Sequence, residues 1–173
     1  MTGTPDIPDY VSDWFTSRGW RLHDHQRALV RAFAERRSTL LIAPTGGGKT
    51  LAGLLPSLID IHENGEGRLH TLYISPLKAL TNDIARNLTA PIEEMGLNVR
   101  TESRTGDTPG AKRQRQRRSP PDILLTTPES LMLMLSYTDA PRIFGGVRAV
   151  VVDETHSFAA TKRGDFTALA LAR

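Results

Sequence analysis

The sequence contains no cysteine, which excludes disulfide bonds and thiolate metal sites. This absence is compatible with a reducing compartment, and we expect the protein in the cytoplasm. No apolar run is long enough to span a bilayer. The first residues, Met1–Asp6, lack the basic and apolar stretches of a signal peptide. We therefore expect no membrane partner.

A strong excess of either charge is also lacking. The 22 Lys and Arg residues and 19 Asp and Glu residues give a net charge of +3. This sum says little about an anionic partner, because the positions of basic residues matter more than their number. Four histidines show no metal-ligand spacing: His23, His25, His62 and His70. With 39% hydrophobic residues in 173, the chain can bury the core of a single domain.

A glycine-rich segment, residues 43–50, follows an apolar run at Leu40–Ile42. Glycines let successive backbone N–H groups face a phosphate chain, Lys49 reaches its terminal phosphates, and the Thr50 hydroxyl binds Mg²⁺. A plain turn is the alternative, and Ala43 stands where the usual pattern has glycine. The Gly-Lys-Thr ending favours ATP binding, with six candidate residues: Thr45, Gly46, Gly47, Gly48, Lys49 and Thr50.

An acidic pair follows a second apolar run, Val150–Val152. Asp153 at the end of a buried strand would hold Mg²⁺, and Glu154 would orient and deprotonate the attacking water. Such a pair is common by chance when it stands alone. Together with the glycine-rich segment it predicts hydrolysis of a nucleoside triphosphate.

Strand patterns alternate with helix patterns along the chain. We predict strands at 39–43, 71–75, 122–126 and 147–153, and helices at 10–15, 24–35, 49–63, 77–95, 129–136 and from 164 onward. This order predicts an α/β fold, a mainly parallel sheet with helices on both faces and ligands at the carboxyl ends of its strands. Residues 1–37 are expected to form a helical segment and residues 38–173 the nucleotide-binding domain.

Two further segments place a proline directly after a strand: Ser75-Pro76-Leu77-Lys78 and Thr126-Thr127-Pro128-Glu129. Free N–H groups at the helix start, hydroxyl groups and the Lys78 charge could hold a phosphate. Ordinary helix caps are the alternative. Phosphate contacts from these segments would follow a sugar-phosphate backbone without reading bases, so nucleic-acid binding would be sequence-independent and sensitive to salt.

The order of these motifs resembles that of superfamily 2 DEXH-box helicases, specifically the large-helicase-related (Lhr-like) group and its ligase-associated branch. The matching segments are His25-Gln26, 43–50, 75–80, 104–108, 126–130 and Asp153–His156. The resemblance implies a RecA-like P-loop NTPase domain that uses ATP and Mg²⁺. It also implies single-stranded DNA as partner, with RNA as an alternative, and a role in DNA repair beside a DNA ligase system.

The resemblance also assigns roles to single residues. Gln26 would contact the adenine edge, with Trp20 or Arg21 packing on the base; a solvated helix residue is the alternative. His156 would couple the nucleotide site to the nucleic-acid face. Arg104 would contact the strand, with a structural turn at Arg104–Thr108 as the alternative. The basic run 112–118 contains no aromatic residue, so we expect a solvated helix face, with accessory phosphate contact as the alternative.

Compared with the motors that it resembles, the sequence is expected to lack two parts. One is the strand of motif III, expected between the P-loop strand and the strand of the acidic pair. The other is a second RecA-like domain, whose arginines contribute roughly 10³–10⁵ in rate. We therefore expect a truncated domain with an incomplete, marginally stable sheet. Three functions remain open: an ATP-dependent DNA helicase or translocase, a nucleotide-gated binding module without useful turnover, and an RNA helicase.

Overall fold

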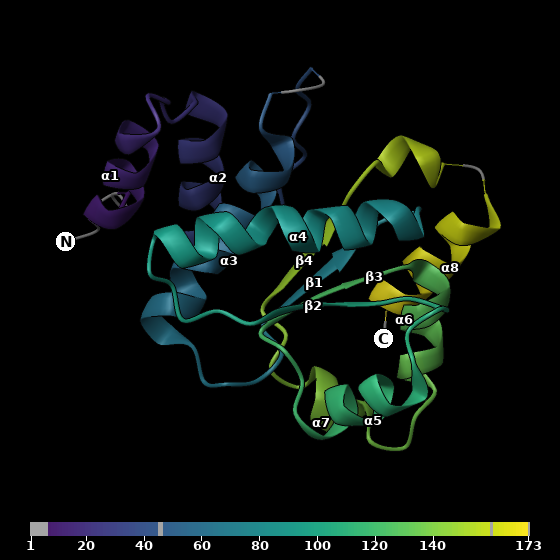
Figure 1. Ribbon diagram of the computed structural model, residues 1–173. Helices are drawn as coiled ribbons and strands as arrows, with labels where there is room; N and C mark the ends of the chain where they lie inside the picture. Colours follow the sequence, from purple (N-terminus) through teal and green to yellow (C-terminus); the bar gives the residue numbers. More distant parts are fainter. Residues whose placement is uncertain (1–6, 45–46, 160, 173) are drawn as a thin grey trace.

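A four-stranded parallel sheet lies between two layers of helices in the computed structural model, which describes residues 7–44, 47–159 and 161–172 (Figure 1). The strands follow the order β2-β3-β1-β4, and every pairing is parallel. Their bounds are β1 Thr71–Ile74, β2 Thr101–Arg104, β3 Ile123–Thr126 and β4 Ala149–Val152. The predicted α/β class with a parallel sheet is confirmed.

The helices fall close to the predicted ranges where apolar periodicity is strong. Their bounds are α1 Asp9–Ser17, α2 Asp24–Ala34, α3 Lys49–Asn64, α4 Lys78–Glu94, α5 Gly110–Arg118, α6 Pro128–Leu135, α7 Ala140–Phe144 and α8 Lys162–Leu171, with a short 3₁₀ turn η1 at Thr155–Ser157. Among the described residues no helix is both long enough and apolar enough to cross a membrane.

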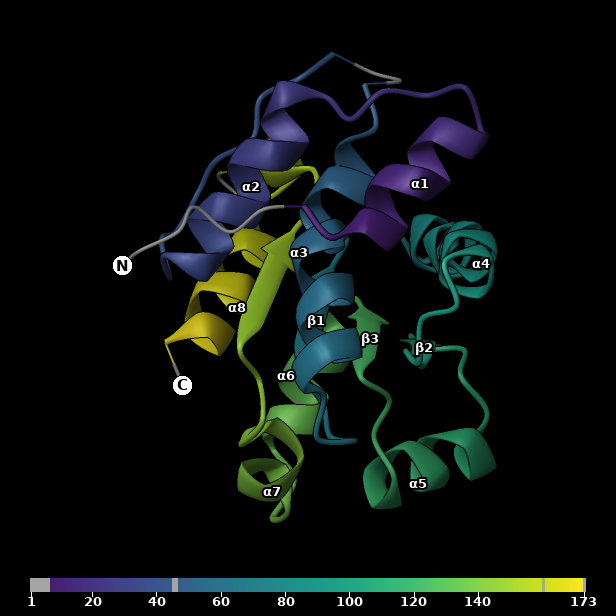
Figure 2. The same ribbon diagram turned by 90° about the vertical axis from the view of Figure 1, so that its left-hand side faces the viewer.

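Alternation along the strands divides the core into two halves. Tyr73, Ile123 and Leu125 pack on one face with side chains of α1 to α4. Leu72, Ile74 and Leu124 point to the opposite face, where α6, α7 and α8 contribute the partners. Figure 2 shows α8 and α6 on one side of the sheet and α3 and α4 on the other. Both faces are therefore covered, as parallel strands require.

The N-terminal helices share the first half of the core. Val11, Trp14 and Phe15 of α1 and Val30 of α2 are buried with residues of α3 and α4. The Trp14 indole also donates a 2.7 Å hydrogen bond to Glu94 of α4. The helical segment before the glycine-rich loop is thus packed directly on the nucleotide-binding part of the chain.

The predicted strand at 39–43 is wrong. Leu40 and Ile42 are 69% and 86% exposed, and no strand is formed there. A cavity of about 1430 Å³ lies between this segment and β4, whose Val150 is 41% exposed. Within the part of the chain that the structure describes, no strand lies between the two. A strand persists only where a neighbour pairs with its backbone groups, and the 39–43 segment has none.

β2, α7 and the short turn η1 were not predicted. β2 is the edge strand next to β3, and its sequence Thr-Glu-Ser-Arg is polar. An edge strand pairs on one side only, so apolar patterning is weak there. α5 contains the whole basic run and buries only Gln116, which agrees with the expected solvated helix face.

Candidate functional site

The glycine-rich loop ends at Gly48, which adopts a left-handed conformation with φ +68° and precedes α3. Glycine takes this conformation without strain. Gly47 N donates to Pro44 O at 3.2 Å, and no side chain caps α3. The N–H groups of the first helical turn are therefore open to an anion. The candidate residues Thr45 and Gly46 lie outside the described residues.

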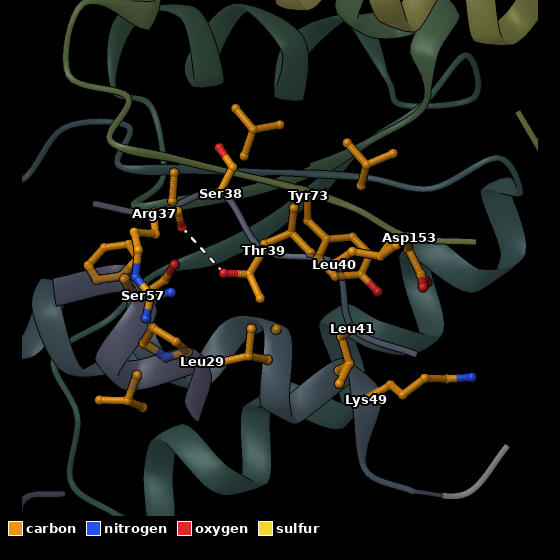
Figure 3. A pocket seen from close by; sticks show the side chains of 18 of the residues that line it. Leu29, Arg37, Ser38, Thr39, Leu40, Leu41, Lys49, Ser57, Tyr73 and Asp153 are labelled. Carbon is orange, nitrogen blue, oxygen red and sulfur yellow. Dashed lines mark hydrogen bonds between the residues drawn. The ribbon is translucent and has the colours of Figure 1, made fainter. Parts of the chain in front are cut away.

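Lys49 is the first residue of α3, and its side chain folds back onto the loop. Its Nζ donates to Ala43 O at 3.0 Å. Figure 3 shows the Lys49 side chain on the same side of the cavity as Leu41. The ammonium group is half-buried and has one backbone acceptor, so a phosphate oxygen could replace the carbonyl as its partner without moving the helix.

Gln26 is buried and joins α2 to the glycine-rich loop. Its side chain is 2% exposed, and its Oε1 accepts from His23 N at 2.9 Å in a capping box. A Cβ at Gly48 would lie 3.3 Å from Gln26 Nε2. The alternative of a solvated helix residue is therefore wrong. The adenine contact stays a prediction, and Trp20 packs edge-on against Trp14 of α1.

The acidic pair lies directly beyond β4. Asp153 N donates to Ile74 O at 2.9 Å, which continues the sheet ladder, and Asp153 Oδ1 accepts from Glu154 N at 2.9 Å. Glu154 has φ +50°, a conformation that costs a non-glycine residue about 1–2 kcal/mol. His156 Nε2 lies 3.3 Å from Glu154 Oε2, and its side chain is exposed. The Asp153 carboxylate thus contacts the backbone of its neighbour, and the Glu154 carboxylate contacts His156.

Tyr73 was missed by sequence reasoning and lies at the centre of this site. Its side chain is buried, and its hydroxyl lies close to the side chains of Asp153 and Thr50. Burial, followed by the neighbouring Asp153 carboxylate, raises the pKa of Tyr73 far above its ordinary value. The phenol therefore keeps its proton and can act as a donor. A hydroxyl-bearing side chain within the apolar strand Thr71–Ile74 is the feature that could have indicated it.

The two expected magnesium ligands therefore lie close to one another, because the side chains of Thr50 and Asp153 are both near the Tyr73 hydroxyl. Hydroxyl and carboxylate oxygens suit Mg²⁺, which commonly takes one or two protein ligands and completes its shell with water and substrate phosphates. No group of three or more His, Cys, Asp or Glu side chains among the described residues could hold a metal by itself. The donor set fits a metal that arrives with a nucleotide.

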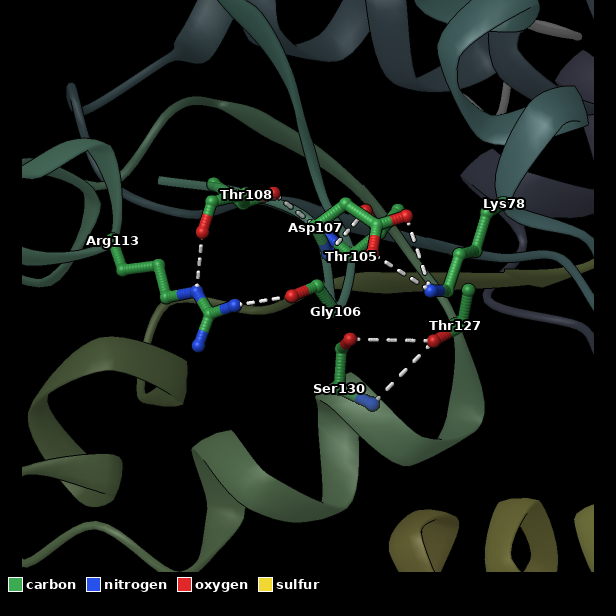
Figure 4. Close-up of polar contacts among 8 residues, drawn as sticks. All are labelled: Lys78, Thr105, Gly106, Asp107, Thr108, Arg113, Thr127 and Ser130. Atoms are coloured by element: carbon green, nitrogen blue, oxygen red, sulfur yellow. Dashed lines mark hydrogen bonds and ion pairs between the residues drawn. The ribbon is translucent and has the colours of Figure 1, made fainter. Parts of the chain in front are cut away.

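A second cluster of motifs lies at the carboxyl ends of β1, β2 and β3. Lys78 is the first residue of α4, and the preceding Leu77 provides no side-chain cap. Lys78 Nζ lies 3.0 and 3.1 Å from the two carboxylate oxygens of Asp107, which follows β2 (Figure 4). Both Leu77 and Lys78 are exposed. This corner offers a cation and an open helix start to the solvent.

Several side chains that we expected to contact phosphate are buried. The side chains of Ser75, Pro76, Thr126, Thr127 and Pro128 are buried. Thr126 Oγ1 donates to Arg104 O at 2.8 Å, and Thr127 caps α6 by accepting from Ser130 N. The Thr127 hydroxyl therefore acts as an ordinary helix cap. These hydroxyl groups shape the motif from inside and are not exposed to a ligand.

Arg104 also differs from its expected role. It is 3% exposed, and its Nη2 donates to the Tyr137 hydroxyl at 2.8 Å. Its guanidinium lies 5.6 Å from the centre of the Tyr137 ring. Burial lowers the pKa of Arg104, although the Tyr137 hydroxyl favours the charged form. The guanidinium faces the interior, so it offers no phosphate contact in this conformation.

Arg163 of α8, which sequence reasoning did not single out, links Glu129 to the Ser75–Lys78 segment. Arg163 Nε lies 2.7 Å from Glu129 Oε1, and its Nη1 donates to Pro76 O at 3.1 Å. Burial raises the pKa of Glu129, but its own backbone N–H, the Thr127 hydroxyl and Arg163 outweigh burial and lower it. Arg163 therefore connects the segments that contain Pro76 and Glu129 to α8.

Comparison with known proteins identifies the family. The model of the DEAD/DEAH box helicase matches residues 23–173. The chain belongs to the DEAD/DEAH box helicase family. All the motifs described above lie within the matched range.

Individual relatives support this assignment. The helicase domain is 40% identical to "Lhr helicase/uracil glycosylase" of Escherichia coli strain K12, over 100% of this chain and 13% of that protein. It is 35% identical to "ATP-dependent helicase Lhr-Core" of Methanocaldococcus jannaschii, over 94% of this chain and 21% of that protein. The helicase domain therefore spans 13% of the length of the Escherichia coli protein and 21% of the length of the archaeal protein.

Solved structures of helicases agree with the fold. The structure of Mycobacterium smegmatis helicase Lhr bound to ssDNA and AMP-PNP matches with a TM-score of 0.88 and 39% identity, over 95% of the helicase domain and 22% of that chain. The DNA-bound and AMPPNP-bound helicase MrfA matches with a TM-score of 0.78 and 30% identity, over 91% and 22%. The RecA-like class expected from the motifs is confirmed.

Proposed function

We propose that this domain binds and hydrolyses ATP as part of an ATP-dependent DNA helicase or translocase. The observation that carries the proposal is the neighbourhood of Tyr73: Thr50 of the glycine-rich loop and Asp153 of the acidic pair both lie close to its hydroxyl, and Asp153 lines the same cavity as Lys49. Thr50 and Asp153 are 103 positions apart in the sequence, and together they form the two halves of a nucleotide site. Gln26 lies beside Gly48 of the same loop, and this location supports the proposed contact of Gln26 with the adenine edge of ATP.

Each residue has a distinct role in the proposed reaction. The open first turn of α3 and Lys49 hold the phosphate chain. Thr50 and Asp153 would hold Mg²⁺, which would supply positive charge to offset that of the phosphates. Glu154 orients and deprotonates the attacking water. His156 lies beside Glu154 and would couple the hydrolytic residue to the nucleic-acid face.

The proposed partner is single-stranded DNA, bound through its backbone. Lys78 and the uncapped start of α4 form the exposed part of the motif cluster, whereas the buried hydroxyl groups position it. The relative bound to ssDNA and AMP-PNP supports this choice. RNA stays the alternative, because backbone contacts alone do not distinguish the two sugars.

The organisation of the whole protein is also proposed. The matched relatives are several times longer than this chain, which supports a motor with a second RecA-like domain that supplies arginines to the ATP site. In our proposal, residues 1–37 carry the Gln motif and residues 38–173 form the first RecA-like domain. A role in DNA repair beside a DNA ligase system is inferred from the motif resemblance.

Steady-state ATP hydrolysis by the 173-residue chain, with and without single-stranded DNA, tests the proposal. We expect Glu154→Gln to keep ATP binding and lose hydrolysis, and Lys49→Ala to lose binding. DNA stimulation that disappears in both variants would support a coupled motor domain. Background rates together with ATP-dependent DNA binding would favour the nucleotide-gated binding module. Unchanged hydrolysis in Glu154→Gln would remove Glu154 from the mechanism.

A further inference from the structure

Four residues, Thr105–Thr108, form a turn after β2 that we call the Asp107 turn. Thr105 N donates to Thr108 Oγ1 at 2.9 Å, and Thr108 N donates to Thr105 O at 3.2 Å. Asp107 N donates to Thr105 Oγ1 at 3.3 Å, and both threonines are buried. The conformation of the turn is therefore set by its own hydrogen bonds.

Arg113 of α5 fastens this turn from outside. Its Nε donates to Thr108 O at 2.7 Å, and its Nη2 donates to Gly106 O (Figure 4). Two bonds from one planar guanidinium fix direction as well as distance. The neighbouring Arg115 contacts Glu102 at 2.7 Å instead. Arg113 is thus the arginine of the basic helix that holds the Asp107 turn.

The turn presents its carboxylate to Lys78. The contact is exposed on both sides, with Lys78 at 53% and Asp107 at 77% side-chain exposure. A carboxylate and a phosphate offer an ammonium group the same kind of anionic oxygen acceptor. Asp107 therefore occupies the position on Lys78 that a nucleic-acid phosphate needs.

We propose that the Asp107 turn, positioned by Arg113, competes with the nucleic-acid backbone for Lys78. A phosphate must displace the Asp107 carboxylate before Lys78 can bind it. This inference rests on the proposed function, since it assumes that Lys78 contacts single-stranded DNA. Exposed ion pairs are weak, so the competition should lower DNA affinity by about two- to fivefold.

Binding of a fluorescent single-stranded DNA oligonucleotide to the 173-residue chain across a salt series tests the competition. Asp107→Asn should raise affinity about two- to fivefold and steepen the logarithmic salt slope by about 0.7, because one more phosphate contact is free to form. The gain should vanish when Lys78→Met is also present. An equal gain in both backgrounds would mean a general charge effect and would overturn the inference.

Arg113→Gln tests the positioning role, and Arg115→Gln is its matched control. Both remove one positive charge from α5, but only Arg113 holds the turn. We expect Arg113→Gln to bind DNA more tightly than Arg115→Gln, and we expect the difference to disappear in an Asp107→Asn background. Equal affinities of the two single variants would show that Arg113 does not position Asp107.

The outcomes separate this inference from the function beneath it. If Asp107→Asn weakens DNA binding, Asp107 is a direct contact, the competition is overturned and the proposed function stands. If the unaltered chain binds no single-stranded DNA while its far-ultraviolet circular dichroism shows a folded domain, the proposed nucleic-acid function fails and the inference fails with it.

Discussion

At the scale of single residues, Tyr73 illustrates how a buried hydroxyl can organise a site made from distant segments. It lies on β1, between the strand that leads to Asp153 and the helix that begins beside Thr50. Burial raises the pKa of Tyr73, so its hydroxyl keeps the proton at neutral pH. A neutral donor can orient the Asp153 carboxylate without adding charge to a metal site.

Replacing Tyr73 tests this orientation. Tyr73→Phe should raise the Mg²⁺ concentration that gives half-maximal ATP binding several-fold, because Asp153 loses a neighbouring hydroxyl that can orient its carboxylate. Removing this buried hydroxyl from beside a carboxylate should also lower the free energy of unfolding by about 1 kcal/mol. A Mg²⁺ titration of fluorescent ATP binding measures the first effect.

Tyr10→Phe is the matched control, because the Tyr10 hydroxyl contacts Glu63 at 3.4 Å, away from the nucleotide loop. Its Mg²⁺ dependence should equal that of the unaltered protein. Equal Mg²⁺ curves for Tyr73→Phe and Tyr10→Phe would show that the hydroxyl does not orient Asp153.

At the scale of elements, α8 acts as a brace across two motif segments. Arg163 contacts Glu129 at the start of α6 and the carbonyl of Pro76 before α4. The pKa of Glu129 is lowered in the folded protein despite its partial burial. A lowered folded pKa stabilises the fold above the unfolded pKa, and the contribution is lost as pH falls through the folded value.

The brace therefore predicts a pH dependence. Urea unfolding followed between pH 7 and pH 3 should show a loss of stability on the acidic side that is smaller in Glu129→Gln. The difference between the two proteins should be greatest at neutral pH and should shrink below the ordinary glutamate pKa of about 4.3. Parallel curves at all pH values would mean that Arg163 and Glu129 do not stabilise each other.

At the scale of the whole molecule, one side of the sheet stays open. β4 is an edge strand beside a cavity, and the 39–43 segment runs along the far side of that cavity with its apolar side chains exposed. Exposed apolar edges favour association and reduce stability. We expect the isolated chain to be marginally stable, and a cooperative melt at high temperature would count against this expectation.

Two substitutions test whether the 39–43 segment contributes to the core. Ile42→Gln should change the free energy of unfolding by less than about 0.5 kcal/mol, because the side chain is exposed. Leu54→Ala, which truncates a fully buried side chain of α3, should cost about 2–5 kcal/mol. Urea denaturation measures both. A comparable cost at Ile42 would show that this segment is a buried strand after all.

Much of the fold and of the nucleotide site could be predicted because it depends on local chemistry. Glycine at position 48 is required by a left-handed turn, and strands β1, β3 and β4 are short apolar runs bounded by polar residues. β2 escaped prediction because an edge strand needs little apolar sequence. The exposed phosphate contacts were overestimated because local sequence does not report burial: Ser75 and Thr126 resemble surface hydroxyl groups until their neighbours are known.

The sequence by itself determined the order of the motifs, the alternation of strands and helices, and the chemistry available at Lys49, Asp153 and Glu154. Each of these depends on neighbouring residues in the chain. Only the tertiary structure decided that Tyr73 lies beside both Thr50 and Asp153, that the Arg104 side chain is buried and that Asp107 forms an ion pair with Lys78. These residues lie 23 or more positions apart in the sequence, and 29 positions separate Lys78 from Asp107. Packing, not local pattern, brings such residues together.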